Sequence, residues 1–377
     1  MKFITRSSEI ILKGKNRPFF EKALRKAIVR AVPDVKLTRR GALFLGETAL
    51  CEQELIKALN TVIGISSFSL VEEVSSDLEE IKNAACKIMC EKKGSFAVRV
   101  NRTDKSFPLT SQEIGREVGS AIFQSQEDAL TIDLTNPEHE LFIDVGQDTT
   151  LLYTRKWEGH SGLPVGTSGR VIALFSGGLD SVLAAYQMMR RGCQVDLVHF
   201  HNFADASKVK GTKVEELAQF TAQFQQETTL YLVPYPLYEI KAGGKINPKQ
   251  DLVLFKHVML RFADALAQEK GYGAIVTGDS LGQVASQTLE NIQATRFGLF
   301  LPVFSPFIGS NKEEIAQLGR KLGIFSTAQK TYTDCCSLMA KNPDTKVGID
   351  GIKRIVEKVD VEEILKSLKE KSETISF

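Results

Sequence analysis

No apolar run in the 377 residues reaches the roughly 18 residues that a membrane-spanning helix needs. The N-terminus, Met1-Lys-Phe-Ile-Thr, also lacks the hydrophobic core of a secretory signal peptide. Both absences argue against a membrane protein and a secreted protein. We therefore predict a cytoplasmic protein with no membrane partner.

The six cysteines fit neither a disulfide scaffold nor the Cys-x-x-Cys pairs of structural zinc and iron–sulfur sites. Disulfides are also rare in the reducing cytoplasm. The spacing therefore predicts neither a disulfide framework nor a structural metal site.

An excess of charge is absent as well, because the net charge is only +2, but its distribution is uneven. Residues 1–40 hold twelve Lys or Arg and three Asp or Glu, a net charge of +9, and the remaining residues sum to −7. A basic arm on an acidic body indicates a polyanionic partner such as nucleic acid, although a solvated basic helix face would have the same composition. The length predicts two or three domains.

The most informative stretch is residues 170–192. Residues 171–175 form an unbroken apolar run, which is typical of a strand buried on both faces. Ser176, Gly177 and Gly178 interrupt this run, and apolar residues at helical spacing follow until Gly192. The pattern predicts a strand, a glycine turn and a helix.

Such a turn directs backbone N–H groups and the positive end of a helix dipole to one point, which favours phosphate binding. The turn is not a Walker A loop, because the lysine is missing, and it is not the dinucleotide-binding Gly-x-Gly-x-x-Gly. The sequence Ser-Gly-Gly-Leu-Asp-Ser at 176–181 instead resembles the pyrophosphate loop (PP-loop) of ATP pyrophosphatases. An ordinary strand-to-helix turn is the alternative.

The N-terminal part predicts two small α/β units. Residues 1–60 read as a strand, a helix opened by Pro18, a hairpin and a second helix, which suits a ferredoxin-like domain. Residues 61–165 predict helices at 78–90 and 111–123, the second with Ser111 as N-cap, and a strand at 96–100. The candidate RNA-binding cations of the two units are Lys22, Arg25, Lys26, Arg30, Arg99, Arg102 and Lys105.

Residues 159–169 are rich in glycine and serine and predict a linker. Strands and helices then alternate, which predicts a doubly wound parallel sheet with its ligands at the carboxyl ends of the strands. His199 and Phe200 lie at one such end, and residues 277–280 lie at another. The stretch 352–369 predicts one surface helix.

Six motifs together resemble the tRNA 4-thiouridine synthetases, or tRNA sulfurtransferases, almost from end to end. They lie at residues 8–16, 96–107, 162–166, 176–181, 276–289 and 334–336. The resemblance implies an α/β protein of three domains. These are a ferredoxin-like domain at 1–60, an RNA-binding THUMP domain at 61–165, and a PP-loop pyrophosphatase domain with a C-terminal helix at 166–377.

The resemblance also implies a reaction, in which ATP with Mg²⁺ adenylates the C4 oxygen of uridine 8 in tRNA. A persulfide on Cys335 then displaces AMP, and Asp180 is the catalytic or metal-linked carboxylate. The nucleotide contacts implied by the motifs are Leu174, Phe175, Ser176, Gly177, Gly178, Asp180, Ser181, His199, Phe200, Lys256, Gly278 and Gln287. The expected partners are tRNA, a cysteine desulfurase as persulfide donor, and a second copy of the chain in a homodimer.

The sequence departs from the family pattern at several positions. Val182 replaces a proline, and Lys256 begins a segment that is usually Arg-Arg-Met-Met. Ser305 and Asn311 stand where an Arg and an Asp are usual, and we expect these changes to affect the uridine pocket or the domain packing. No rhodanese domain follows, so Cys336, Cys193 or an external thiol is expected to regenerate Cys335.

Two other functions fit parts of the pattern. The first is an ATP-dependent amidating ligase acting on RNA, which would need a source of ammonia. The second is a non-catalytic THUMP RNA-binding protein with a relic ATPase domain, against which the intact loop at 176–181 argues.

Overall fold

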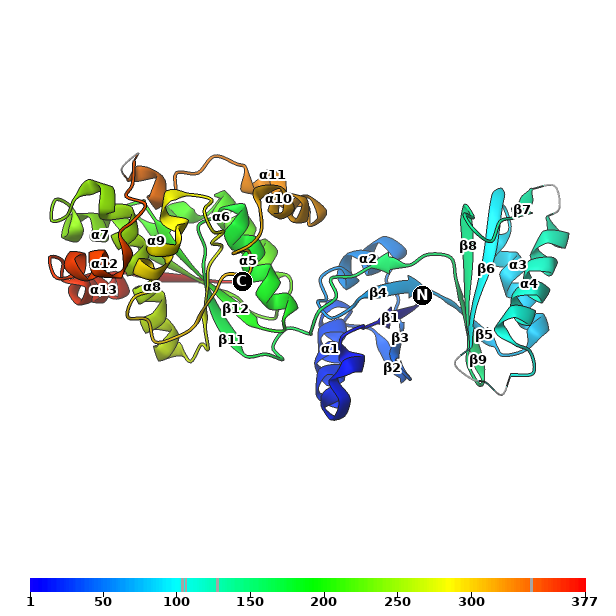
Figure 1. Ribbon diagram of the computed structural model, residues 1–377. Coiled ribbons are helices and arrows are strands. Elements are labelled where there is room, and N and C mark those ends of the chain that lie inside the picture. Colours follow the sequence, from blue (N-terminus) through cyan, green and yellow to red (C-terminus); the bar gives the residue numbers. More distant parts are fainter. Residues whose placement is uncertain (103–104, 106, 127–128, 340–341) are drawn as a thin grey trace. The chain divides into compact units, whose positions relative to one another are not determined.

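The computed structural model describes residues 1–377 except 103–104, 106, 127–128 and 340–341. It divides into two compact units, Met1–Gly162 and Leu163–Phe377 (Figure 1). The division falls inside the predicted linker at 159–169. Each unit is described separately below as the first and the second unit.

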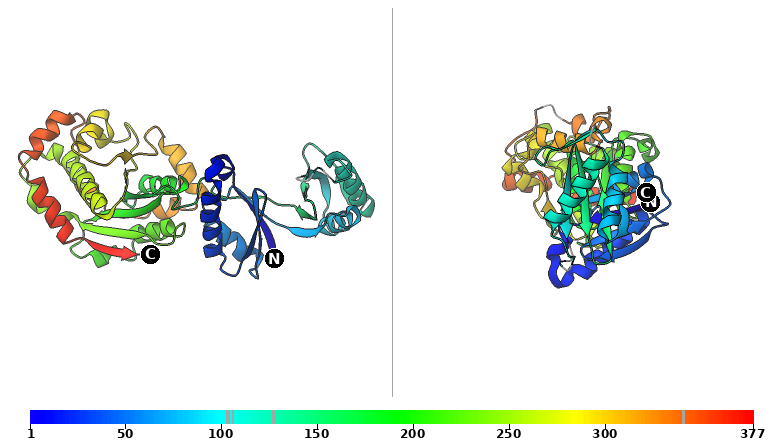
Figure 2. Two further views of the ribbon diagram at one scale, coloured as in Figure 1. Left: turned by 90° about the horizontal axis from the view of Figure 1, so that it is seen from below. Right: turned by 90° about the vertical axis from the view of Figure 1, so that its right-hand side faces the viewer.

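The first unit begins with an antiparallel sheet in the order β10-β4-β1-β3-β2. Its strands are β1 (Lys2–Arg6), β2 (Lys36–Arg40), β3 (Leu43–Glu47), β4 (Ser67–Leu70) and β10 (Trp157–Glu158). Helices α1 (Arg17–Ala31) and α2 (Glu52–Leu59) lie on one face (Figure 2). The element order confirms the ferredoxin-like fold, although β4 and β10 extend this sheet past the predicted boundary at residue 60.

Helix α1 follows the 3₁₀ segment η1 (Ile10–Asn16) and has Pro18 in its first turn, as the sequence predicts. Leu24 and Ile28 are fully buried in the core of this domain. The basic face of α1, which we define as Lys22, Arg25, Lys26 and Arg30, is exposed. The helical period therefore separates a core face from a cationic face.

The second sheet of the first unit has the order β5-β9-β8-β6-β7. Its strands are β5 (Glu72–Ser75), β6 (Gly94–Arg102), β7 (Leu130–Ile132), β8 (His139–Val145) and β9 (Thr149–Tyr153). Helices α3 (Leu78–Met89) and α4 (Ser111–Ser125) cover one face of it (Figure 1). The predicted N-cap Ser111 is wrong, because the Thr110 hydroxyl accepts the Glu113 N–H at 3.3 Å and forms a capping box.

The second unit contains a six-stranded sheet in the order β15-β14-β11-β12-β13-β16. The strands are β11 (Arg170–Leu174), β12 (Gln194–His201), β13 (Thr229–Pro234), β14 (Ile275–Val276), β15 (Val303–Phe304) and β16 (Glu373–Ser376). All neighbours pair in parallel except β13 with β16. This arrangement confirms the predicted doubly wound sheet, and β16 covers one of its edges.

Helices flank both faces of this sheet, with α5 and α6 on one side and α8 on the other (Figure 1). The α-helices are α5 (Leu179–Arg190), α6 (Lys213–Ala222), α7 (Tyr235–Ala242), α8 (Asp251–Lys270), α9 (Leu289–Thr295), α10 (Lys312–Lys321), α11 (Phe325–Ala328), α12 (Gly348–Val356) and α13 (Val361–Glu370). The 3₁₀ segments are η2 (Ala206–Val209), η3 (Pro248–Gln250), η4 (Ala285–Gln287) and η5 (Cys335–Leu338).

The single helix predicted at 352–369 is in fact two helices, α12 and α13. The Asp360 carboxylate accepts the Glu363 N–H at 2.9 Å, so Asp360 caps a new helix and ends the first pattern. Ile355, Val359 and Leu368 are nevertheless buried, as predicted. The apolar spacing survives the break because both helices pack on the same core.

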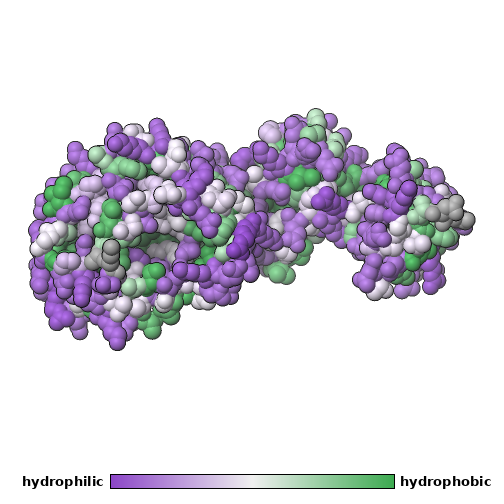
Figure 3. All heavy atoms as spheres, turned by 90° about the horizontal axis from the view of Figure 1, so that it is seen from above, coloured by the Kyte–Doolittle hydropathy of each residue, from purple (hydrophilic) through white to green (hydrophobic). Residues whose placement is uncertain are grey.

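No helix among the described residues is both long and apolar enough to cross a membrane. Figure 3 shows hydrophilic side chains over most of the face that it displays, with hydrophobic groups in small patches between them. Both observations agree with the short apolar runs of the sequence.

A buried carboxylate stabilises the six-stranded sheet of the second unit at the end opposite to the carboxyl ends of its parallel strands. Asp196 of β12 accepts hydrogen bonds from the Tyr272 hydroxyl at 2.7 Å and the Thr229 N–H at 2.7 Å. The Arg170 guanidinium pairs with the same carboxylate at 3.0 Å. Asp196 is 2% exposed, so its charge is stabilised almost entirely by these three partners.

Replacing Asp196 with Ala should lower the free energy of local unfolding of β12 and β13 by about 3 kcal/mol, because a buried N–H and an arginine lose their acceptor. Hydrogen exchange of peptides from these strands in the full chain measures the change. Glu362→Ala, which breaks an exposed pair with Arg261, is the matched control and should change stability by less than about 0.5 kcal/mol. Equal hydrogen-exchange protection of β12 and β13 in the two variants would contradict the stabilising role assigned to Asp196.

Candidate active site

The order of the strands creates a switch point in the six-stranded sheet of the second unit. From β11 the chain continues to β12 and β13 on one side, and it returns to β14 and β15 on the other. In a doubly wound sheet the crevice at the carboxyl ends of such a pair holds the ligand. Residues 175–181 follow β11 and residues 277–280 follow β14, so both sequence motifs lie at this crevice.

The loop at 176–181 is organised by its serines. The Ser176 hydroxyl accepts the Gly178 N–H at 3.2 Å, and the Ser181 hydroxyl donates to the Gly178 carbonyl at 2.9 Å. Gly177 has φ +76°, and a Cβ there would lie 2.8 Å from the Val214 side chain. Only glycine fits this turn, which delivers the chain to the N-terminus of α5. The free N–H groups of that helix end suit a phosphate.

Two lysines from distant parts of the sequence approach the loop. The Lys213 side chain passes 3.8 Å from the position that a Cβ of Gly177 would take, and its ammonium donates to the Ala328 carbonyl at 2.9 Å. Lys312 lies near Asp180 and lowers the pKa of that carboxyl. These lysines supply positive charge beside a loop that lacks the Walker lysine.

Asp180 is the carboxylate of the loop. Burial raises its pKa, and the hydrogen bond from the Gln283 amide at 3.2 Å and the charge of Lys312 oppose this rise only in part. In the part of the chain that the structure describes, no group of three or more His, Cys, Asp or Glu could hold a metal ion. Mg²⁺ usually takes one or two carboxylates and completes its shell with water and substrate phosphates. Asp180 therefore fits an ion that arrives with a nucleotide.

Gly278 joins the two motifs physically. A Cβ on Gly278 would lie 2.7 Å from the carbonyl carbon of Asp180 and 2.8 Å from the nitrogen of Ser181. The backbone after β14 therefore lies directly against the first turn of α5. A side chain at position 278 would displace the loop.

A polar cluster around Asp279 follows directly. The Asp279 carboxylate accepts from the Thr277 hydroxyl at 2.8 Å and the Gln287 amide at 3.2 Å. Burial alone would raise the pKa of Asp279, but Lys256, these hydrogen bonds and Arg296 hold it below its usual value. Lys256 Nζ is 3.8 Å from one carboxylate oxygen, so the predicted contacts Lys256 and Gln287 meet on one carboxylate.

His199 and Phe200 at the end of β12 have buried side chains. Both ring nitrogens of His199 have partners, the Phe175 carbonyl at 2.7 Å and the Tyr332 hydroxyl at 2.8 Å. Burial lowers the pKa of His199 to about 4, so the ring is neutral near pH 7. Phe175 and Phe200 are core residues, and Leu174 packs against the same core. The nucleotide contacts predicted at these positions stay predictions, and the burial of the side chains leaves them to the backbone.

The two adjacent cysteines have different surroundings. Cys335 is 3% exposed, its thiol donates to the Phe200 carbonyl at 3.2 Å, and burial raises its pKa. Cys336 is half-buried. Burial raises the pKa of Cys336 to about 11, and the nearby Lys256 opposes this rise. Cys336 is therefore the thiol coupled to the Asp279 cluster.

Cys193 precedes β12, whereas Cys335 contacts the far end of the same strand at Phe200. Seven residues of strand span roughly 20 Å. The Cys193 thiol donates to the Ser168 carbonyl at 3.7 Å and is buried. Regeneration of Cys335 by Cys193, one of the expected possibilities, is therefore contradicted by their positions.

The departures from the family pattern have local explanations. The Asn311 side chain caps α10 by accepting from the Glu313 and Glu314 N–H groups, each at 3.0 Å, a role in which Asn and Asp are equivalent. Ser305 accepts from the Arg296 guanidinium at 2.6 Å. Val182 is fully buried in α5. Asn311 therefore has the capping role that an Asp would have, and an arginine stands beside Ser305.

Of the predicted RNA-binding cations, the basic face of α1 is exposed, and Lys105 is exposed too. Arg99 pairs with Glu140 at 2.8 Å, and Arg102 donates to the Phe107 carbonyl at 3.0 Å. Residues 103, 104 and 106 of the loop motif lie outside the described residues. The basic face of α1 is therefore an exposed cationic surface of the first unit.

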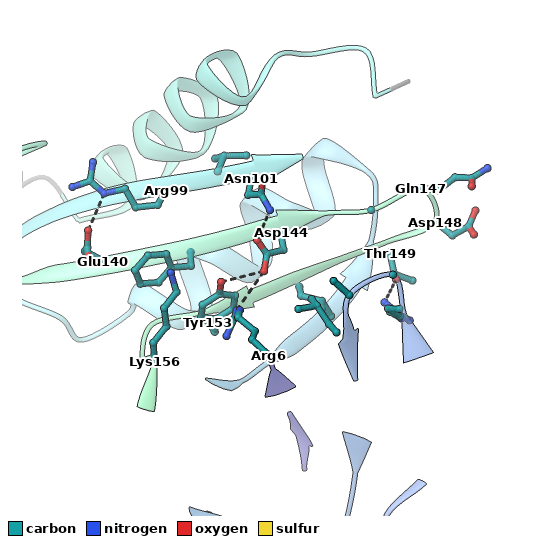
Figure 4. A pocket seen from close by; sticks show the side chains of 18 residues that line it. Arg6, Arg99, Asn101, Glu140, Asp144, Gln147, Asp148, Thr149, Tyr153 and Lys156 are labelled. Atoms are coloured by element: carbon teal, nitrogen blue, oxygen red, sulfur yellow. Dashed lines mark hydrogen bonds and ion pairs between the residues drawn. The ribbon is translucent and has the colours of Figure 1, made fainter. Parts of the chain in front are cut away.

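A groove of about 1240 Å³ lies between the two sheets of the first unit (Figure 4). Arg6 and Lys156 line it together with Asp144 and Tyr153. Arg6 pairs with Asp144 at 3.6 Å, and Lys156 lies over the Phe142 ring at 3.7 Å from its centre. Arg6 and Lys156 therefore both have partners within the groove. These interactions stabilise the contact between the two domains of the first unit.

The sequence motifs located most of this site, but not all of it. Gln283 lies within the motif at 276–289, but it was not identified as a site residue in the sequence analysis. Lys213 and Arg296 lie outside every motif, and only the fold brings them to the loop and to Asp279. No sequence signal identified them.

Family models match three successive parts of the chain. They are described as the ThiI ferredoxin-like domain at residues 2–69, the THUMP domain at 75–155, and thiamine biosynthesis protein (ThiI) at 166–361. Together they follow the three predicted domains.

Relatives cover nearly the whole chain. A probable tRNA sulfurtransferase of Thermus thermophilus is 38% identical over 98% of this chain and 92% of its own length. One from Caldanaerobacter subterraneus is 34% identical over 96% of each chain. A crystal structure of a 4-thiouridine synthetase–RNA complex with bound ATP has a TM-score of 0.88 at 30% identity, covering 100% of this chain and 99% of the other. A Pyrococcus horikoshii protein has a TM-score of 0.65 at 27% identity, covering 85% and 99%.

Gly278→Ala should weaken ATP binding at least about tenfold, because the added methyl group would displace the backbone of the phosphate loop. Isothermal titration of the full chain with ATP measures this. Gly309→Ala is the matched control, since a Cβ there meets nothing within 4 Å and should leave ATP affinity unchanged. If Gly278→Ala binds ATP as tightly as wild type, the loop is not the phosphate site.

Proposed function

The chain belongs to the ThiI family of tRNA sulfurtransferases, and from this premise we propose that it adenylates uridine 8 of tRNA and replaces its C4 oxygen with sulfur. We further propose the domain division of the sequence analysis, with the RNA-binding domains in the first unit and the PP-loop domain in the second. A cysteine desulfurase as persulfide donor, a homodimer and the cytoplasm complete the proposal.

One observation carries the proposal. The phosphate-loop motif and a half-buried cysteine are linked through adjacent residues of one crevice, because Gly278 contacts the loop and the next residue, Asp279, belongs to the cluster beside Cys336. This arrangement supports a nucleotide site after β11 and β14 with a sulfur-carrying thiol of η5 beside it. An amidating ligase would have no use for this thiol.

The residues suit the two steps of this chemistry. Loop N–H groups, Lys213 and Lys312 would stabilise the charge on the departing pyrophosphate, and Asp180 would hold Mg²⁺ against the phosphates. Mg²⁺ would supply further charge neutralisation. The C4 oxygen leaves as part of AMP, which is a far better leaving group than an oxygen of the pyrimidine ring.

We assign the persulfide to Cys336, although the sequence predicted Cys335. The Cys335 thiol is buried and donates to a carbonyl, whereas Cys336 is half-buried beside Lys256, whose charge opposes in part the rise that burial causes in the pKa of Cys336. The terminal sulfur of the Cys336 persulfide attacks C4, AMP leaves, and a disulfide joins the base to Cys336. An external thiol then reduces this disulfide and releases 4-thiouridine. Lys256 is the cation next to that sulfur.

The first unit would bind tRNA through its charge. The basic face of α1 is exposed, and contacts between lysine or arginine and phosphate supply affinity without base specificity. Such contacts would position the tRNA for reaction in the second unit. Nucleoside mass spectrometry of tRNA from a strain that lacks this protein tests the overall proposal: loss of 4-thiouridine is expected, and its persistence would contradict the proposal.

Cys336→Ser should reduce 4-thiouridine formation below about 1% of wild type, because the sulfur carrier is lost, while tRNA-dependent pyrophosphate release continues. Cys335→Ser is the matched variant one residue away and should retain most of the activity. Reconstitution with ATP, unmodified tRNA and a persulfide donor measures both products. The reverse pattern would return the role to Cys335, as the sequence first predicted.

Reversing the basic face of α1 to Glu should weaken tRNA binding and reduce the slope of log K against log salt by about 2 to 3, because fewer counterions are released. Filter binding over a range of salt concentrations measures this slope. A matched reversal of four exposed cations in the second unit should leave the slope nearly unchanged, at Arg354, Lys358, Lys366 and Lys371. Equal effects of the two reversals would mean that net charge alone, and not α1, binds the RNA.

A further inference from the structure

One carboxylate in the crevice faces two cations. Asp279 lies 3.8 Å from Lys256 Nζ and 3.5 Å from an Arg296 nitrogen, with a different carboxylate oxygen toward each. All three side chains are less than a third exposed. The cluster therefore carries one more positive than negative charge in a place where water is largely excluded.

Two departures from the family pattern meet in this cluster. Lys256 stands where the pattern has an arginine, and Ser305 stands where it has another. The Ser305 hydroxyl accepts from Arg296 at 2.6 Å and bonds to the Thr277 hydroxyl at 2.8 Å, which in turn bonds to Asp279. Arg296, which follows α9, therefore brings a guanidinium to Ser305 and Asp279.

We propose that Arg296 is a positioning residue: it holds Asp279 from one side and so leaves the ammonium of Lys256 available to the nucleotide. This inference rests on the proposed function and on the nucleotide contact of Lys256 that the family resemblance implies. Arg296 acts through Asp279 and does not itself touch the reacting atoms.

The distances support this division of roles. Neither cation makes a short contact with Asp279, so neither is fully neutralised, whereas Ser305 fixes the guanidinium firmly. A largely buried carboxylate needs a cation, because an unpaired buried charge is costly. Without Arg296, Lys256 would be the remaining cation for Asp279. The lysine would then move to the carboxylate and away from the nucleotide.

Fold geometry, not sequence spacing, creates this arrangement. Arg296 comes seventeen residues after Asp279 and beyond the last residue of the motif at 276–289. It reaches Asp279 because α9 ends beside Ser305, the residue that follows β15. Lys256 and Ser305 are therefore linked through Asp279 and Arg296.

The test is ATP titration of the full chain without tRNA. Arg296→Ser should weaken ATP binding about tenfold, and Arg296→Ser with Asp279→Asn should recover it to within about threefold, because no carboxylate remains to capture Lys256. Recovery of ATP affinity when the Asp279 charge is also removed distinguishes a positioning role of Arg296 from a loss of structure. Wild-type affinity in Arg296→Ser, or no recovery in the double variant, would overturn the inference.

Ser305→Arg provides a second route if the double variant does not fold. In an Arg296→Ser background it returns a guanidinium to the cluster with the donor and acceptor positions exchanged, and it should restore ATP affinity. Failure to restore it would also overturn the inference. Arg320→Ser, which removes an exposed arginine of α10 paired with Glu313, is the control and should bind ATP normally. A wild-type chain that does not bind ATP would defeat the proposed function itself, so the two failures are distinct.

Discussion

The contact between Gly278 and the first turn of α5 is the constraint on which the site depends. The backbone of one strand end touches the backbone of another, and no side chain fits between them. It fixes the phosphate loop relative to Asp279, and Asp279 is in turn linked to Lys256, Arg296 and Cys336. A site assembled from four distant segments thereby becomes one rigid crevice at the switch point of the sheet.

Charge is distributed in this crevice according to burial. The phosphate loop offers backbone N–H groups and lysines, and the only carboxylate of its six residues is Asp180, whose pKa burial raises. The neighbouring cluster pairs one carboxylate with two cations beside a half-buried thiol. His199 contributes no charge, because burial keeps its ring neutral. The lysines and backbone N–H groups of the crevice thus suit a ligand that carries phosphates.

Local sequence patterns predicted those elements of the fold that depend on interactions between residues close in sequence. The helix α1, the glycine turn and the alternating strands follow from apolar period, Pro18 and the special backbone of Gly177. The boundary between α12 and α13 was missed, because a cap at Asp360 interrupts a pattern that packing continues. Thr110 and Ser111 are both good caps, and the backbone geometry of the structure decides between them.

The site was predictable only as far as its motifs extended. Burial of Cys335 against Phe200 and the approach of Arg296 to Ser305 are long-range contacts, which depend on the fold as a whole. Adjacent cysteines have the same sequence context, so burial alone separates them. Motifs identify residue types that a chemistry needs, whereas tertiary contacts decide which of them are available.

A crystal structure of this chain with a non-hydrolysable ATP analogue tests the central claim most directly. The account predicts that the terminal phosphates lie on the N–H groups of residues 176–181, with Lys256 toward the nucleotide and Cys336 on the same side of the sheet. Phosphates bound away from this loop, or a loop whose N–H groups stay unengaged, would contradict it.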